Sequence, residues 1–205
     1  CSLRDLVRAA KRCHQSFLPR VLSFAGGWLK RNPDHDSAGI VFASVLTATG
    51  SKLDIGKAKQ WYQEHRTSNY ACDVISAILA HGYRCNKTPD EYSVKEAQLL
   101  LRAETSTDRD LLLVGTLLGA HTDGESIAWA KEAYARTQAP WILIRLLMRA
   151  PDVEMIAEAE AFFARVKDVS FIEPEMIYAV LTADPKNKVA LKRARVWLKR
   201  SPENK

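Results

Sequence analysis

Residues 25–32, Ala25-Gly26-Gly27-Trp28-Leu29-Lys30-Arg31-Asn32, begin a pattern that recurs along the chain. In each copy an alanine is followed, three and four residues later, by two positions that are mostly large and apolar. The other copies are Ala58 with Trp61 and Tyr62, Ala97 with Leu100 and Leu101, Ala130 with Ala133 and Tyr134, Ala159 with Phe162 and Phe163, and Ala194 with Trp197 and Leu198. Successive alanines lie 33, 39, 33, 29 and 35 residues apart, the spacing of helix-pair repeats.

A second pattern lies between these copies and follows the same spacing. Its members are the apolar pairs Val45-Leu46, Ile78-Leu79, Leu117-Leu118, Leu146-Leu147 and Val180-Leu181. A helix pair cannot bury its apolar faces alone, so stacked pairs share one core, and small alanines let crossing helices approach closely. No stretch alternates as a strand does. We therefore predict an all-α fold, an α-solenoid of about six helix-turn-helix repeats. It would form one domain over residues 1–205, with repeat boundaries near 33, 67, 106, 139 and 170.

Capping residues, prolines and glycines mark the expected helix ends. A first helix is expected over residues 2–14, and a second helix should end at Asn32-Pro33. Gly50 and Gly82 are expected to end two later helices. The expected helix starts are Pro19, Asp36 or Ser37, Asp54, Ser68-Asn69, the capping box Thr88-Pro89-Asp90-Glu91, Thr107-Asp108, Asp123, Pro140, Pro151-Asp152, Pro174 and Asp184-Pro185.

An alanine followed four residues later by a large apolar residue, at a period near 34, resembles the second helix of tetratricopeptide repeats. The likeness covers nearly the whole chain. The first helices lack that family's Trp–Leu–Gly–Tyr signature, which only Leu118-Gly119 approaches. HEAT-like and pentatricopeptide repeats are near neighbours. The resemblance implies a right-handed superhelix whose concave surface binds a peptide, a protein or another part of the same chain.

Composition excludes several classes of protein. With 47% hydrophobic residues, the chain is too apolar for a disordered segment. Its longest apolar run, Leu111–Ala120, is too short to cross a bilayer, and no signal peptide is visible. The four cysteines form no CxxC pair, which favours free thiols and a cytoplasmic location. Cys1 in place of Met suits either a processed lipoprotein end or a piece of a longer array, and we expect the latter.

No motif of a known catalytic or metal site is present. The chain lacks a phosphate-binding loop, a GxSxG elbow, an HExxH motif and an EF-hand loop. Asp34-His35-Asp36 lies where helix caps are needed, and His65, Cys72, His81 and Cys85 match no common zinc spacing. Trp28, Trp61 and Trp197 share one repeat position and are expected in the core. We predict no enzyme activity, no cofactor and no metal.

Charge is unevenly distributed within the formal net charge of +6. Residues 1–35 hold seven Lys or Arg against two acids, residues 186–205 hold eight against one, and residues 36–185 hold fifteen against twenty-one. A basic end can meet nucleic acid, an anionic membrane or an acidic protein. The candidate partner-binding residues are Lys188, Lys192, Arg193, Arg195, Lys199 and Arg200 in the last helix and Arg8, Lys11 and Arg12 in the first.

Two functions remain open from the sequence. The leading hypothesis is a non-catalytic interaction, scaffold or sensor module in a longer chain, which binds a protein, a peptide or another domain of that chain and no membrane. The alternative is a nucleic-acid-binding helical-repeat protein that uses its basic ends. The acidic middle argues against the alternative, because a track for a phosphate backbone should be basic throughout.

Overall fold

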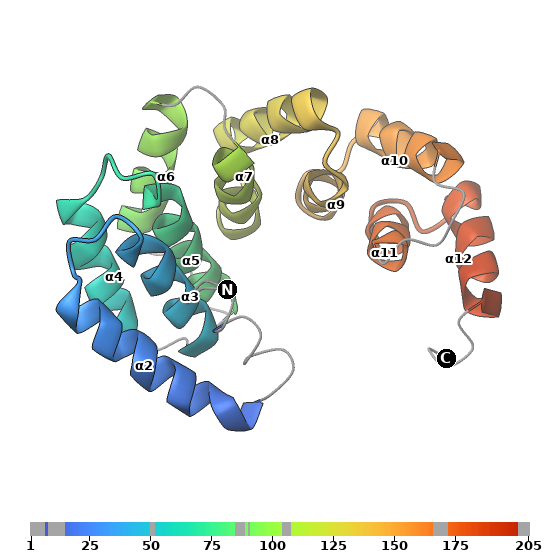
Figure 1. Ribbon diagram of the computed structural model, residues 1–205. Coiled ribbons are helices and arrows are strands. Elements are labelled where there is room, and N and C mark those ends of the chain that lie inside the picture. Colours follow the sequence, from blue (N-terminus) through green and yellow to red (C-terminus); the bar gives the residue numbers. More distant parts are fainter. Residues whose placement is uncertain are drawn as a thin grey trace. The chain divides into compact units, whose positions relative to one another are not determined.

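The computed structural model describes residues 7, 15–49, 52–84, 89, 91–103, 108–165 and 172–200. In these residues every regular element is a helix and no strand occurs, which confirms the all-α class (Figure 1). Apart from Val7, the helix expected over residues 2–14 lies outside the described residues. The chain divides into two compact units, Cys1–Ala120 (unit 1) and His121–Lys205 (unit 2).

Unit 1 is built from two layers of helices. Its elements are a short 3₁₀ helix at Gln15–Phe17, α2 (Leu18–Arg31), α3 (Ala38–Thr49), α4 (Lys52–Glu64), α5 (Ala71–Arg84), α6 (Glu91–Ala103) and α7 (Asp108–Ala120). One layer holds α3, α5 and α7, with α5 packed against both neighbours. In the other layer α4 packs against α3 and α5, and α6 packs against α5 and α7.

Unit 2 repeats this arrangement. It contains α8 (Gly124–Thr137), α9 (Pro140–Arg149), α10 (Val153–Arg165), α11 (Glu173–Ala183) and α12 (Lys188–Arg200). The helices α9 and α11 pack side by side, and each also contacts its neighbours along the chain (Figure 1). We call α3, α5, α7, α9 and α11 the first helices and α2, α4, α6, α8, α10 and α12 the second helices of the predicted pairs.

The two repeated sequence positions form much of the core. Ala25, Ala58, Ala97, Ala130 and Ala159 are all 0% exposed, as expected for small residues at helix crossings. In the last copy Ala194 is half-buried, and Ala190, one turn earlier, takes the fully buried place. Leucines in the second pattern are equally buried from Leu46 to Leu147, whereas Leu181 is half-buried. The number of repeats and the superhelix remain predictions.

Several helix ends agree with the local signals. Pro19, Pro140 and Pro174 each lie in the first turn of a helix, where a missing N–H group is tolerated. Asp123 caps α8, because its carboxylate accepts a hydrogen bond from the Ser126 N–H at 2.7 Å. Asp152 caps α10 in the same way, because its carboxylate accepts a hydrogen bond from the Met155 N–H at 2.8 Å.

Three predicted helix ends were wrong. Asp54 does not begin α4, which starts two residues earlier at Lys52. Gly82 does not end α5, which continues to Arg84. Asp184 does not cap α12, because its side chain accepts from the Lys186 N–H at 3.1 Å and forms a turn. The capping residue is Asn187, whose Oδ1 accepts from the Ala190 N–H at 2.9 Å. The helix α12 therefore begins at Lys188, after this turn.

Not every large apolar side chain of these helices packs into the core. In α7, Leu112 is 44% exposed, whereas its neighbour Leu113 is fully buried. In α12, Val189 and Leu198 are each 40% exposed. A run of consecutive leucines surrounds a helix with apolar side chains, so periodicity alone does not select the packed face.

Candidate functional site

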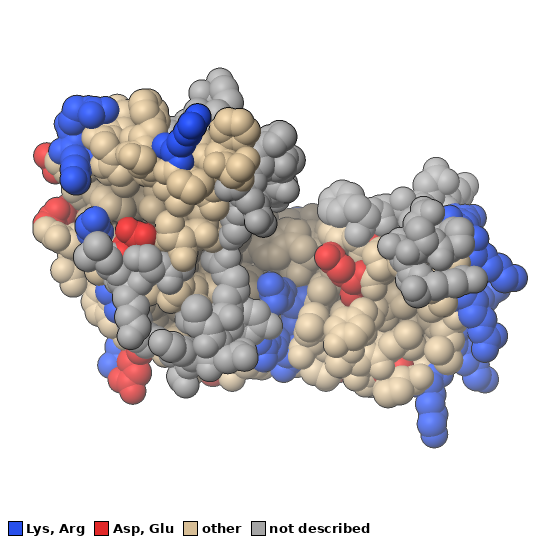
Figure 2. All heavy atoms as spheres, turned by 90° about the horizontal axis from the view of Figure 1, so that it is seen from below, with Lys and Arg blue, Asp and Glu red and all other residues tan. Residues whose placement is uncertain are grey.

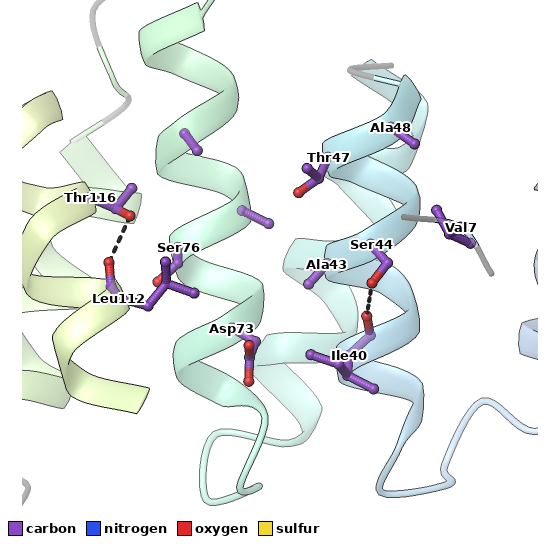
Figure 3. A pocket seen from close by; sticks show the side chains of 12 residues that line it. Val7, Ile40, Ala43, Ser44, Thr47, Ala48, Asp73, Ser76, Leu112 and Thr116 are labelled. Carbon is purple, nitrogen blue, oxygen red and sulfur yellow. Dashed lines mark hydrogen bonds between the residues drawn. The ribbon is translucent and has the colours of Figure 1, made fainter. Parts of the chain in front are cut away.

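Each unit carries a pocket lined by its first helices. The unit 1 pocket has a volume of about 310 Å³ and lies between side chains of α3, α5 and α7 (Figure 3). Val7 also lines it, 33 residues before the equivalent Ile40 of α3. The unit 2 pocket has a volume of about 500 Å³ and is lined by residues of α9 and α11.

The two pockets use the same register of the repeat. On each of α3, α5 and α9, four lining residues stand six, three and two positions before and one position after the buried leucine of the second pattern; α3 adds Ala48. Such spacing places four side chains on one helix face. The sets are Ile40, Ala43, Ser44 and Thr47 on α3; Asp73, Ser76, Ala77 and Ala80 on α5; and Trp141, Ile144, Arg145 and Met148 on α9. We call this surface the inner face.

In unit 1 the inner face is composed mostly of small and hydroxylated residues, with Ile40 and Asp73 as the exceptions on α3 and α5. Ser44 donates to the Ile40 carbonyl and Thr116 donates to the Leu112 carbonyl, each at 2.7 Å, so these two hydroxyls are satisfied within their own helices (Figure 3). Ser76, on α5, is 3% exposed, and its hydroxyl finds no hydrogen-bond partner among the described residues. A buried hydroxyl without a partner is costly, so a ligand that bonded to it would gain free energy.

In unit 2 the inner face is composed of large side chains. Trp141, Ile144 and Met148 come from α9 and Tyr178 comes from α11, with Arg145 and Glu175 beside them. Tyr178 is 62% exposed and Met148 is 38% exposed. Tyrosine, tryptophan, methionine and arginine are the residue types enriched where proteins bind other proteins.

The inner face of α9 is not evident from the sequence. The helix α9 has apolar side chains on two sides, because Ile142, Leu143, Leu146 and Leu147 are buried on the opposite side from the pocket. The signal that could have revealed the inner face is the second apolar stripe in so short a helix, since a single packed face needs only one.

A tyrosine–glutamate hydrogen bond joins successive second helices in each unit. The Tyr62 hydroxyl donates to Glu96 at 2.9 Å, and the Tyr134 hydroxyl donates to Glu158 at 3.1 Å. Both tyrosines lie four residues after a repeat alanine, and both glutamates lie one residue before the next one. Burial raises the pKa of both hydroxyls, and the glutamate contacts raise it further. The shared register shows that the two units pack these helices alike.

The predicted basic residues of α12 are mostly exposed. Lys and Arg spheres gather at the right-hand edge of Figure 2, where α12 lies. The exposed cations are Lys188, Lys192, Arg195, Lys199 and Arg200. Arg193 differs, because its side chain is one-fifth exposed and its Nε donates to Glu173, which is buried at the start of α11. Arg8, Lys11 and Arg12 lie outside the described residues.

The residues considered as metal ligands have other contacts. The His65 ring stacks on Trp61 with centroids 4.6 Å apart, and its Nδ1 lies 2.9 Å from the Trp61 carbonyl oxygen. Asp36 accepts a hydrogen bond from the Ser68 hydroxyl at 2.9 Å. Cys85 lies outside the described residues, which hold no cluster of three His, Cys, Asp or Glu that could bind a metal ion.

The tryptophans of the repeat position differ in burial. Trp61 is buried, and its indole N–H donates to the Pro33 carbonyl at 3.1 Å. Trp28 and Trp197 are half-buried. Among the described helices, none is both long and apolar enough to cross a bilayer.

Comparisons of the chain with protein-family models, with curated proteins and with solved structures find no match. The tetratricopeptide-like assignment therefore depends on the spacing and register of this chain alone.

Proposed function

We propose that this protein is a non-catalytic helical-repeat module that binds a peptide or protein segment on its inner faces. The observation that carries the proposal is the shared register of the two pockets, which are lined by equivalent positions of different first helices. A repeat protein that presents one helix face in several copies offers an extended binding surface.

The unit 2 pocket is the stronger anchor point for such a ligand. Its volume of about 500 Å³ accommodates a large apolar side chain. Trp141 and Tyr178 can pack against that side chain at a low cost in conformational entropy, because each has only two rotatable bonds. Arg145 and Glu175 supply opposite charges beside the anchor and can fix the direction of the bound chain.

The test is selection of random peptides on the purified protein, followed by binding measurements on variants. Tyr178→Ala and Met148→Ala remove exposed lining side chains, so the fold should survive both. We expect the selected peptides to share a large apolar residue and to bind Tyr178→Ala at least about tenfold more weakly.

Val153→Ala is the matched control, because Val153 is an exposed apolar residue of the same unit that does not line the pocket. Peptides that bind the wild type and Tyr178→Ala equally well would refute the pocket as the anchor. Failure of the protein to enrich any peptide would refute the proposed function.

A further inference from the structure

The helix α12 carries a straight row of four cations on its solvent side. Lys188, Lys192, Arg195 and Lys199 follow one another at intervals of four, three and four residues, and all four are exposed. These intervals place the side chains on one face of an α-helix. At a rise of about 1.5 Å per residue the row is about 16 Å long.

No acidic side chain compensates this row among the described residues. None of the four cations forms an ion pair there, whereas Arg193 on the packed side of α12 is paired with Glu173. Like charges three or four residues apart on a helix repel one another and destabilise it. The row therefore lowers the stability of α12 unless an anionic partner is bound.

We propose that the row Lys188–Lys192–Arg195–Lys199 binds the phosphate backbone of a nucleic acid without base specificity. A nucleic acid strand in a duplex presents one phosphate about every 3.4 Å of axis, so about 16 Å of duplex offers more phosphates than the row has cations. Each Lys or Arg of the row can therefore contact a phosphate wherever along the duplex the helix binds. An acidic protein helix would satisfy the row only with carboxylates at matching intervals.

The side chains beside the row favour a phosphate backbone over a lipid surface. The exposed Leu191 and Leu198 lie on one flank and Val189 on the other, each about a quarter turn from the centre of the row. An interfacial helix inserts its apolar face and keeps its cations at the sides, which is the opposite order. No exposed aromatic residue lies on α12 for base stacking, so binding should be insensitive to sequence.

This inference is independent of the inner-face proposal and confines nucleic acid binding to one helix. The acidic balance of residues 36–185 argues against a continuous track along the chain, whereas the four cations of the row form no ion pair with the described acidic residues. Tyr178→Ala should therefore bind nucleic acid as the wild type does.

The test is fluorescence anisotropy with labelled single-stranded RNA and duplex DNA over a series of salt concentrations. For four phosphate contacts we expect log K to fall against log salt with a slope of about −3.6 for the duplex and about −2.8 for the single strand. Changing all four residues to Gln (K188Q, K192Q, R195Q and K199Q) should weaken binding at least about tenfold and bring the slope close to zero.

The matched control is the variant R20Q, K30Q, K57Q and K95Q, which removes four exposed cations of unit 1 and lowers the formal net charge from +6 to +2, as the α12 variant does. Circular dichroism would verify that both variants keep their helices. Equal weakening by the two variants would refute the row as a site. Binding of a polyglutamate peptide or of anionic vesicles, with no binding of nucleic acid, would also overturn the proposal.

Discussion

Glu173 and Arg193 form an ion pair whose carboxylate is withdrawn from water. Glu173 is 1% exposed, and its Oε1 accepts from the Arg193 Nε, while Oε2 has no partner among the described residues. The glutamate lies in the first turn of α11, where the helix dipole favours a negative charge. The pair contributes little net stability by itself, but either partner left alone is costly.

Replacing Arg193 by Ala should therefore destabilise the protein strongly. Glu173 would remain buried without its cation, which costs about 3–5 kcal/mol. The measurement is the urea-unfolding free energy of Arg193→Ala. Arg195→Ala is the control, since Arg195 is exposed on the same helix and its loss should change stability by no more than about 0.5 kcal/mol. Equal losses of unfolding free energy in the two variants would show that Arg193 is not needed to compensate the charge of Glu173.

The packing of α3 against α4 depends on one glycine. A Cβ at Gly39 would lie 2.4 Å from a ring carbon of Trp61 and 2.8 Å from the Tyr70 Cβ. The absence of a side chain thus lets the indole reach the helix and lets its N–H bond to Pro33. At Gly56 in α4, by contrast, no atom would lie within 4 Å of such a Cβ.

Gly39→Ala and Gly56→Ala should consequently have opposite effects. Overpacking at Gly39 is expected to cost about 1–3 kcal/mol, which exceeds the gain in helix propensity. Gly56→Ala should gain up to about 1 kcal/mol, because it only reduces the conformational freedom of the unfolded chain. Thermal unfolding should show a lower midpoint for Gly39→Ala and a higher midpoint for Gly56→Ala than for the wild type. A stable Gly39→Ala protein would contradict the close approach of Trp61.

The capping carboxylates of α8 and α10 make unit 2 sensitive to acid. The Ser126 backbone N–H lowers the pKa of Asp123, and the Lys131 ammonium, followed by the Met155 N–H, lowers the pKa of Asp152. A carboxyl with a lower pKa in the folded chain contributes stability above its unfolded pKa of about 3.9. That contribution is lost as the pH falls through the folded pKa.

We expect unfolding midpoints in urea to stay level from pH 7 to about pH 5 and to fall below about pH 4. The double variant Asp123→Asn and Asp152→Asn retains capping oxygens but cannot titrate at these positions, so its midpoint should fall less steeply in acid. If the unfolding midpoint of the double variant fell with pH as steeply as that of the wild type, the two caps would not cause the loss of stability in acid.

At the scale of the whole molecule, two compact units divide the chain at Ala120 and His121. This division falls inside one predicted helix pair, that of α7 and α8. Residues 33, 67 and 139 lie in connections between helices, while 106 and 170 lie outside the described residues. The single domain over residues 1–205 remains a prediction.

A core substitution in one unit should destabilise the helices of that unit more than those of the other. Leu79→Ala in α5 and Leu147→Ala in α9 each remove a buried side chain and should cost about 2–5 kcal/mol. We expect amide hydrogen exchange to rise most in α3, α5 and α7 for the first variant and in α9 and α11 for the second. Exchange that rises uniformly through all helices in both cases would show a single cooperative unit instead.

The helical class, the buried alanines and most helix starts follow from the amino-acid sequence alone. These features are local, since a proline's missing N–H or an alanine in a repeated apolar stripe acts within one or two turns of helix. Ala58 and Ala130 could therefore be placed in the core, and Pro140 at a helix start, before any packing was known.

Which of several similar side chains enters the core, caps a helix or forms an ion pair depends on the tertiary structure. It selected Leu113 over Leu112 for the core, Asn187 over Asp184 for the cap of α12, and Arg193 for pairing with Glu173. The inner face of α9 became visible in the same way, since both sides of that helix are apolar. Each choice depends on the helix packed opposite, and a residue's own neighbours in the chain do not carry that information.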